Sequence, residues 1–380
     1  MQCIQCKGKG LCGLSRCPIT SRFLAQATIK PSASYQGSAP SVFVGSFGYP
    51  DVQGGPLLIE DGDHPPEWLA RGLGIEDIVG IRARTIRGRS LAWQVEGGLQ
   101  EIALSSRPLE VDVAFSRPVS FAMTFDGIVA PVGFSGEIRR LDVVGSANVG
   151  RLVDRITADT DLGASEACME LSRGGSDVYG ITKLMTAGLL GKHRRFVPTR
   201  WAITAVDDTI STAFKKEIAR FPPLDEYLVF SGDVFSNRIV CILAPGDWKY
   251  EMIEVWGKKT LWAGDTEAIV QDREGMTKQG YSPLSGAYYS ARLAVCEYLA
   301  RERHSARAIV LRHISSDYWA PLGTWVIREA TRKAMASPPV SCESLDAAVA
   351  VASARIGFSH WQQHSTLIPE MRTQRTLFSF

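Results

Sequence analysis

Four of the eight cysteines lie within the first 17 residues, and this cluster limits what the start of the chain can form. The four are Cys3, Cys6, Cys12 and Cys17. Zn²⁺ prefers a closed tetrahedral set of such soft ligands in structural sites, and so short a segment cannot bury enough apolar surface to order itself without a cross-link. The spacing therefore predicts one bound Zn²⁺ in a segment over residues 1–20. An iron–sulfur cluster, a redox pair and unbound thiols are the alternatives.

A zinc ion held by four protein ligands leaves no position for a catalytic water, so the predicted role of this segment is structural. The remaining cysteines stand among apolar or small neighbours, which is not the arrangement of a disulfide framework. The first segment lacks the apolar stretch of a signal peptide, and no run of roughly 18 apolar residues follows it. We therefore expect a cytoplasmic protein without a membrane partner.

The charge balance limits how the chain could bind nucleic acid. Lys and Arg together number 42 and Asp and Glu together number 40, so the charge of the whole chain would not drive strong binding. Any contact with DNA must come from a local patch. At 380 residues the chain is long enough for two domains, and 45% hydrophobic residues are ordinary for a protein with a sizeable interior.

The order of predicted elements indicates an α+β or mixed α/β class with a two-domain core. Residues 30–40 are rich in Ser, Pro and Gly and predict a linker. Strands are predicted at 42–44, 110–115, 119–125, 201–206, 226–230, 238–243, 250–255 and 308–313, and the closely spaced 226–255 group suggests an antiparallel meander. Helices are predicted over 208–220, with Asp208 as its cap, and over 283–303, 321–336 and 344–356. The expected domains are an α/β domain over 21–270 and a mostly helical domain over 271–365.

The last residues of the chain, within a predicted tail over 366–380, fit the pattern Gln-x-x-aliphatic-x-x-aromatic, the peptide by which many proteins bind the ring-shaped sliding clamp. Gln374, Leu377 and Phe380 occupy the three positions, and Phe378 belongs to the same predicted set. One tight helical turn would place Leu377 and Phe380 on the same side as an apolar plug for a surface pocket. The commonest form of the motif has two adjacent aromatics, and this sequence has one. The alternative is that these apolar residues fold back onto the parent domain.

Two kinds of stretch predict binding to phosphate or DNA. A basic and aromatic stretch contains Lys192, Arg194, Arg195 and Arg200, together with Phe196 and Trp201. Guanidinium groups contact phosphates and aromatic rings stack on unpaired bases, whereas a solvated loop anchored by its aromatics is the alternative. The glycine-rich loops with Gly45, Ser46 and Gly48 and over residues 145–151 follow predicted strands, but neither fits the Walker or dinucleotide spacing. Tight turns are the alternative for both.

Candidates for catalysis are weak. Asp207 and Asp208 are predicted to lie at a strand end, where functional groups often gather, although helix capping also explains Asp208. His313 and Asp317 follow another strand and could form a polarised pair. Further polar candidates in a predicted loop are Asp272, Arg273, Lys278 and Tyr281. Whether the chain is an enzyme stays open.

Five strings carry a resemblance to a known family: CIQCKGKGLCGLSRCPI, SVFVGSFGYPDVQGGPL, KHRRFVPTRWAITAVDD, DREGMTKQGYSPLSGAYYSARLAVCEYL and QRTLFSF. The chain resembles the archaeal Nre family over nearly its whole length, and within it the NreA branch, whose members are implicated in DNA repair. The resemblance implies a zinc-finger-like amino terminus on the four early cysteines. It also implies a clamp-binding tail, a PIP motif for PCNA, on Gln374, Leu377 and Phe380. It leaves the reaction open.

The function expected from the sequence is therefore DNA-damage repair by a protein that the sliding clamp PCNA recruits to DNA and that binds DNA or a nucleotide. Two alternatives remain open at this point. One is a metal-dependent nuclease or other DNA-processing enzyme, and the other is a nucleotide-binding metabolic enzyme.

Overall fold

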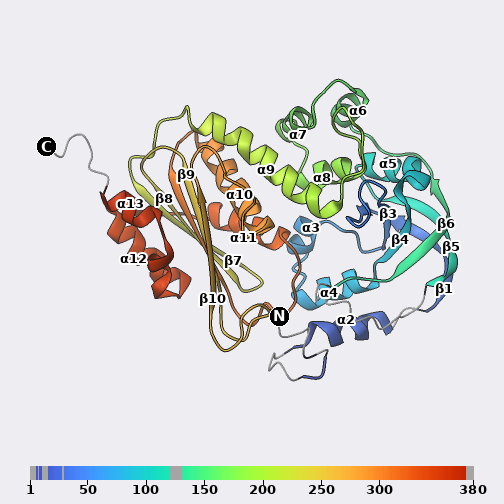
Figure 1. Ribbon diagram of the computed structural model, residues 1–380, viewed down its shortest axis with the longest axis horizontal. Coiled ribbons are helices and arrows are strands. Elements are labelled where there is room, and N and C mark those ends of the chain that lie inside the picture. Colours follow the sequence, from blue (N-terminus) through green and yellow to red (C-terminus); the bar gives the residue numbers. More distant parts are fainter. Residues whose placement is uncertain (1–5, 7, 11–15, 28–29, 120–130, 374–380) are drawn as a thin grey trace. The chain divides into compact units, whose positions relative to one another are not determined.

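The computed structural model describes residues 6, 8–10, 16–27, 30–119 and 131–373 (Figure 1). Within these ranges the chain is mixed α/β, with two six-stranded sheets, which confirms the predicted class. It divides into two compact units: unit 1 comprises Met1–Cys17 and Ser211–Phe380, and unit 2 comprises Pro18–Ile210. In the described part of the chain, no helix has the length and apolar character needed to cross a membrane.

Unit 2 is built on a sheet with the strand order β1-β5-β6-β4-β3-β2. Its strands are β1 (Ser32–Ala39), β2 (Ser41–Val44), β3 (Gln53–Leu58), β4 (Ile86–Leu91), β5 (Leu109–Val119) and β6 (Ser135–Val144). Its helices are α2 (Pro18–Ala27), α3 (Pro65–Ala70), α4 (Ile75–Arg84), η1 (Ala92–Val95), α5 (Glu96–Leu104), α6 (Arg151–Ala158), α7 (Ala164–Arg173) and α8 (Val178–Thr186). Alternate residues of β5, from Leu109 to Phe115, are buried, as expected for a strand with one face on the core.

The predicted linker over residues 30–40 is wrong, because most of it forms β1. This strand pairs with β5 in antiparallel register from Ser34 opposite Ala114 to Ala39 opposite Leu109. Its small and polar residues are mostly exposed and carry little of the apolar alternation that identifies a strand. The backbone pairing with β5 therefore holds a segment whose composition is typical of a loop.

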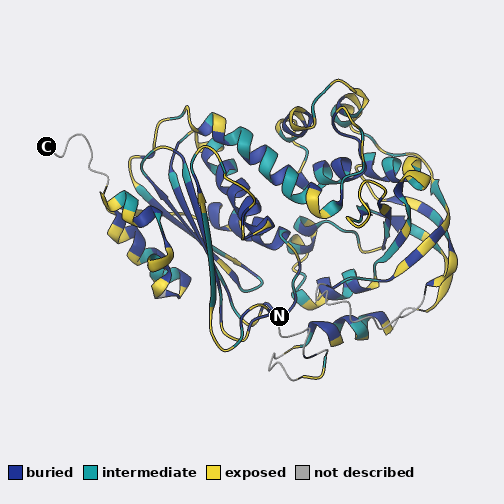
Figure 2. Cartoon of the chain, viewed as in Figure 1, coloured by how far each residue is buried: buried dark blue, intermediate teal, exposed yellow. Residues whose placement is uncertain are grey.

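Unit 1 is built on a sheet with the strand order β10-β9-β11-β8-β7-β12. Its strands are β7 (Tyr227–Val234), β8 (Asn237–Ala244), β9 (Lys249–Trp256), β10 (Ala268–Glu274), β11 (Arg307–Ile314) and β12 (Val340–Cys342). Its helices are α10 (Gly286–Glu302), α11 (Trp325–Met335), α12 (Leu345–Ile356), η2 (Ser359–His364) and α13 (Leu367–Thr373). Figure 1 shows α10 and α11 on one face of this sheet and α12 and α13 on the other. Figure 2 shows that the central strands are buried along most of their length.

The predicted meander over residues 226–255 is correct only in part. β7 and β8 pair antiparallel, as expected. β9, however, pairs in parallel with β11, which also pairs with β8 and so lies between them. A strand that enters from a distant part of the chain cannot be recognised from the spacing of its neighbours.

The predicted strand over residues 201–206 is wrong, because these residues belong to helix α9 (Thr199–Ile218). Ala202, Val206 and Ile210 are buried, and their spacing of four residues is that of one face of a helix. Asp208 therefore lies inside the helix and does not cap it.

The compact units divide between Ile210 and Ser211, whereas the sequence placed the domain boundary near residue 270. The predicted domain over 271–365 contains the helices α10, α11 and α12, but it also contains β11 and is not a separate domain. β11 lies between β8 and β9 and joins the strands over 227–256 to the later helices, so these strands share a core with residues beyond 271.

Candidate nucleic-acid interface

In unit 2 the structure brings together two stretches that the sequence marked separately, the Gly45 loop and the basic stretch before α9. The backbone N–H of Val44 donates to Thr199 Oγ1 over 2.9 Å, a contact between residues 155 positions apart. Phe196 packs against a small apolar cluster of Val44, Val52 and Ala92. The loop over residues 45–52 and the segment over 196–201 are therefore held to one end of the sheet.

Exposed aromatic side chains gather at this end of unit 2. Phe47 is 95% exposed, Tyr49 43% and Trp201 49%, and the ring centroids of Tyr49 and Trp201 lie 5.2 Å apart. Trp93 in η1 is 60% exposed and follows β4, whose Leu91 pairs with Gln53 directly after the loop. These four aromatics make up four of the nine large hydrophobic residues that are exposed in the described ranges. A grouping of this kind indicates an interaction surface.

The loop that carries Phe47 and Tyr49 is a tight turn stabilised by its own backbone. Gly48 has a φ of +78°, a backbone conformation that residues with a side chain rarely adopt. The N–H of Gly45 donates to the carbonyl of Gln53 over 2.8 Å. Because the Gly45 donor is bonded within the loop, the predicted phosphate-binding role of Gly45, Ser46 and Gly48 gains no support here. The loop contributes aromatic surface.

In the basic stretch, some charged side chains are exposed to solvent and one is hydrogen-bonded to the protein backbone. Lys192, Arg195 and Arg200 are exposed. Arg194 has a φ of 44°, and its guanidinium donates to the carbonyl of Leu189 and, over 2.6 Å, to the carbonyl of Asp159. Arg194 therefore ties loop backbone together, and the three exposed cations are the ones available to a phosphate ligand. With Phe47, Tyr49, Trp93 and Trp201 they form what we call the aromatic–basic surface.

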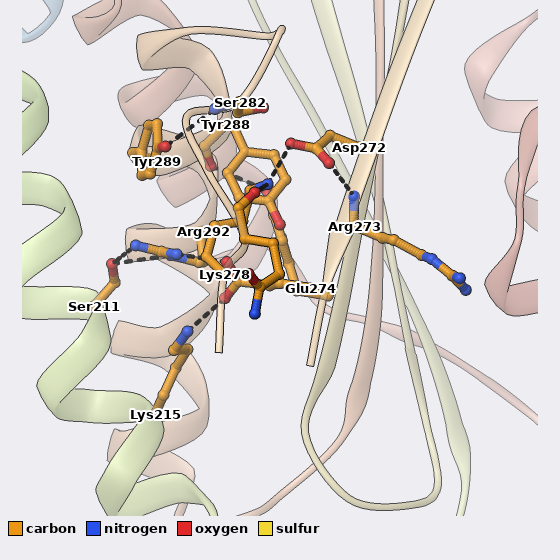
Figure 3. A network of polar contacts seen from close by, with 12 residues as sticks. Ser211, Lys215, Asp272, Arg273, Glu274, Lys278, Ser282, Tyr288, Tyr289 and Arg292 are labelled. Atoms are coloured by element: carbon orange, nitrogen blue, oxygen red, sulfur yellow. Dashed lines mark hydrogen bonds and ion pairs between the residues drawn. The ribbon is translucent and has the colours of Figure 1, made fainter. Parts of the chain in front are cut away.

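Unit 1 contains a second cluster of charged and aromatic residues, and this one is buried (Figure 3). The carboxylate of Glu274 lies 2.7 Å from Lys215 Nζ and 2.7 Å from Arg292 Nη1, and all three side chains are buried. Arg292 also donates to Ser211 Oγ over 3.1 and 2.9 Å. These contacts connect β10, an edge strand of the sheet, with α9 and α10, and we call them the Glu274 network.

The Glu274 network extends to residues that the sequence marked as polar loop candidates. Asp272 and Arg273 lie in β10, and Asp272 forms an ion pair of 2.9 Å with Lys278. Lys278 Nζ lies 5.4 Å from the ring centroid of Tyr288, whose hydroxyl pKa is raised by burial and by the charge of Glu274. The opposite charges are paired within unit 1, which is typical of a structural network.

The weak catalytic candidates do not form an active centre in the described residues. Asp207 and Asp208 lie within helix α9 and not at the end of a strand. Asp207 is buried, and both residues have interaction partners. His313 in β11 stacks on Phe358, and burial followed by the charge of Arg238 lowers its pKa. No hydrogen bond or ion pair between His313 and Asp317 is present in the described ranges.

The early cysteines are described in part. Cys6 is buried, Cys17 is partly exposed, and neither is in a disulfide. Cys3 and Cys12 lie outside the described residues. Among the residues that are described, no group of three or more His, Cys, Asp or Glu side chains is placed to hold a metal ion. The predicted four-cysteine zinc site thus stays a prediction.

The predicted clamp-binding residues Gln374, Leu377, Phe378 and Phe380 also lie outside the described residues. The helix before them, α13, is firmly held. The buried carboxylate of Glu251 accepts hydrogen bonds of 2.7 Å from the backbone N–H and the hydroxyl of Thr366, and Leu367 and Ile368 are buried. The structure therefore anchors the chain directly before the motif.

Comparisons with known proteins identify the family. The family model described as Archaeal Nre, N-terminal, matches residues 11–263, and the model described as Archaeal Nre, C-terminal, matches residues 273–380. The chain belongs to the archaeal Nre family. No solved structure matches it.

Three relatives match over most or all of the chain. The DNA repair protein NreA of Archaeoglobus fulgidus is 35% identical over 396 residues, covering 100% of this chain and 99% of its own length. The DNA repair protein NreB of the same organism is 36% identical over 395 residues and is covered over its full length. The DNA repair protein NreA of Haloferax volcanii is 34% identical over 349 residues, covering 85% of this chain and 83% of its own length. These near-equal identities do not separate the NreA branch from NreB.

Proposed function

We propose that this chain acts in DNA repair by binding DNA through the aromatic–basic surface, and that the sliding clamp recruits it through the terminal motif. The observation that carries DNA binding is the presence of four exposed aromatics at one end of unit 2 and of three exposed cations in the stretch whose Phe196 and Thr199 contact that end. Arginine contacts phosphate oxygens, and aromatic rings stack on bases. Relatives that match the full chain are named DNA repair proteins, which supports the same process.

A binding experiment with paired variants tests the role of the exposed cations. Arg195→Ala with Arg200→Ala is expected to weaken the binding of a labelled oligonucleotide. The slope of log affinity against log salt should shrink, by about 0.7 per lost phosphate contact on a single strand. The matched control, Arg220→Ala with Arg301→Ala, removes two exposed arginines from unit 1 and should leave the slope unchanged. Equal effects of the two double variants would contradict the proposal.

Recruitment by the clamp PCNA rests on Gln374, Leu377, Phe378 and Phe380, directly after the anchored helix α13. Burial of a Leu or Phe side chain is worth about 1.5 to 3 kcal/mol, so Leu377→Ala or Phe380→Ala should weaken clamp binding roughly tenfold or more. Gln374→Ala should cost less. Calorimetry of a peptide over residues 369–380 and of protein lacking residues 374–380 measures this. Undiminished binding by the shortened protein would remove the motif from the proposal.

A structural zinc ion on Cys3, Cys6, Cys12 and Cys17 completes the proposed organisation. Four thiolates are the donor set that Zn²⁺ favours, and Cys6 and Cys17, the two described members, both belong to unit 1 and form no disulfide. Elemental analysis of metal-replete protein should give one zinc per chain. Full zinc content after Cys3→Ser with Cys12→Ser would contradict the assignment.

A further inference from the structure

A polar hollow of about 590 Å³ opens in unit 2 beside the aromatic–basic surface. Its walls include Ser90, Gln94, Gly97, Gly98, Arg139 and Arg140. They come from the end of β4, from η1, from the start of α5 and from β6, which pack against one another.

The strand register places the hollow next to the exposed aromatics. Ser90 pairs with Gly54 and Leu91 with Gln53, so the end of β4 lies beside the start of β3, where the Phe47 loop returns to the sheet. Trp93 and Gln94 are consecutive residues of η1, and Ala92 belongs to the same apolar cluster as Val44 and Phe196. A ligand on the aromatics could therefore extend into the hollow within one unit.

A β-bulge lies in the part of β6 that lines the hollow. In a regular strand, neighbouring side chains point to opposite faces of the sheet. Arg140 is paired with Ala114 and Ile138 with Phe115, so Arg139 is one extra residue in β6 with no counterpart in β5. Bulges redirect side chains and are frequent next to functional sites. Here the bulge lies within the run of Ile138, Arg139, Arg140 and Leu141, all of which line the hollow.

The residues that line the hollow include two arginines and no acidic residue, so the hollow is positively charged. Arg140 Nε lies 2.5 Å from the carboxylate of Asp142, and both side chains are largely exposed, so this pair is weak. Arg139 forms no ion pair with any described residue. Glu96, at the start of α5, accepts a hydrogen bond of 2.9 Å from Gln100. Arg139 thus has no ion-pair partner in the described part of the chain and Arg140 has only an exposed one, which suits a phosphate ligand.

We propose that this hollow is a phosphate subsite for a single nucleic-acid strand whose neighbouring bases stack on Trp93 and on the rings of the Phe47 loop and Trp201. The inference rests on the proposed DNA binding and specifies the form of the ligand. In an intact duplex the base faces are already stacked on one another, so exposed aromatic rings favour unpaired bases. Arginines that contact phosphates position the strand without reading its sequence.

Fluorescence anisotropy with the full-length protein tests the proposal, using a labelled twelve-residue oligothymidylate and a labelled blunt duplex of the same length. The single strand should bind more tightly than the duplex. Arg139→Ala with Arg140→Ala should weaken single-strand binding at least about fivefold and reduce the salt slope by about 0.7 to 1.4, for one or two lost phosphate contacts. Arg139→Lys with Arg140→Lys should recover part of the loss. Unlabelled thymidine monophosphate should compete only at concentrations far above those of the unlabelled oligonucleotide.

Different failures have different meanings. If the unmodified protein binds neither DNA form, the proposed DNA binding itself is overturned. If it binds DNA but the double alanine variant keeps the full affinity and salt slope, the subsite is overturned while DNA binding stands. Equal binding of duplex and single strand would overturn the preference for unpaired bases, and equally strong competition by the monophosphate would identify a free-nucleotide site. Unchanged thermal unfolding of the double variant excludes misfolding as the cause of a loss.

Discussion

In unit 1, Lys215 and Arg292 contact the buried carboxylate of Glu274, whereas in unit 2 Lys192, Arg195 and Arg200 are exposed in the stretch that contains Phe196 and Trp201. Lys and Arg side chains thus form buried ion pairs in one region and are exposed to solvent in the other. Removing one partner from a buried charge group is costly, while an exposed cation contributes little to stability. The burial of the charges, rather than their number, therefore separates a structural network from a candidate binding surface.

The largest effect is expected from Glu274→Gln, which leaves Lys215 and Arg292 buried without the carboxylate that both contact. The free energy of unfolding should fall by about 3 to 5 kcal/mol, as for other buried pairs that lose one partner. Urea unfolding measures the change. The matched control is Glu302→Gln, which removes the exposed carboxylate beside Arg301 and should change stability by less than about 0.5 kcal/mol. Similar losses for both variants would break the distinction between buried and exposed charges.

Two adjacent arginines of the basic stretch provide the next test, because Arg194 has internal hydrogen-bond partners whereas Arg195 is exposed. Arg194→Ala removes charged hydrogen bonds to the backbone carbonyls of Leu189 and Asp159, so stability should fall by about 1.5 to 3 kcal/mol. Arg195→Ala should leave stability nearly unchanged and lower the salt dependence of DNA binding. Thermal unfolding and binding titrations of both variants check this. The reverse assignment of the two effects would contradict the description of the surface.

Phe47→Ala tests the aromatic part of the surface alone. Loss of one stacking ring is worth about 1 to 3 kcal/mol per base, so single-strand affinity should fall roughly fivefold to 150-fold. Stability should change by less than about 0.5 kcal/mol because Phe47 is 95% exposed. Leu24→Ala, which shortens another exposed hydrophobic side chain of unit 2, is the control and should leave affinity unchanged. If Leu24→Ala and Phe47→Ala weakened binding equally, a specific stacking role would be lost.

His313 is intermediate between the buried and the exposed charged residues, since it is partly buried and the charge of Arg238 acts on it. Burial, followed by the charge of Arg238, lowers its pKa below the usual 6.5. In the acidic range below pH 6.5 the unfolded chain therefore binds a proton that the folded chain does not yet hold, and stability falls as the pH falls. Urea unfolding at several pH values between 7.5 and 5 should show a smaller decline for His313→Gln. An unchanged decline would remove His313 as a contributor.

Local sequence patterns predicted much of unit 1 but not its assembly. Strands with continuous apolar runs, such as β8 and β11, and the long helix α10 follow directly from residue type. The position of β11 between β8 and β9 depends on pairing between distant segments, which local patterns do not contain. The same limit applies to Glu274 and Lys215, whose contact joins residues 59 positions apart.

The sequence identified some segments of the aromatic–basic surface but not their contact with one another. Charge density identified the stretch around Lys192, and the glycine turn marked the loop around Gly48, but their contact through Val44 and Thr199 depends on the fold. Phe47 and Trp93 carry no signal in the sequence, because an aromatic residue is more often buried than exposed. Arg139 and Arg140 carry no sequence signal either, since the hollow is formed by β4, η1, α5 and β6, which only the fold brings together.

The central claim, that unit 2 binds unpaired DNA through its exposed aromatics, is tested most directly by photochemical cross-linking. A single strand containing 5-bromodeoxyuridine is bound to the full-length protein and irradiated, and the modified peptides are mapped by mass spectrometry. Adducts are expected on the loop around Phe47 and Tyr49, on Trp93 and on Trp201, and duplex competitor should reduce them less than single-stranded competitor. Adducts confined to exposed aromatics of unit 1, such as Trp262 or Tyr281, would contradict the claim.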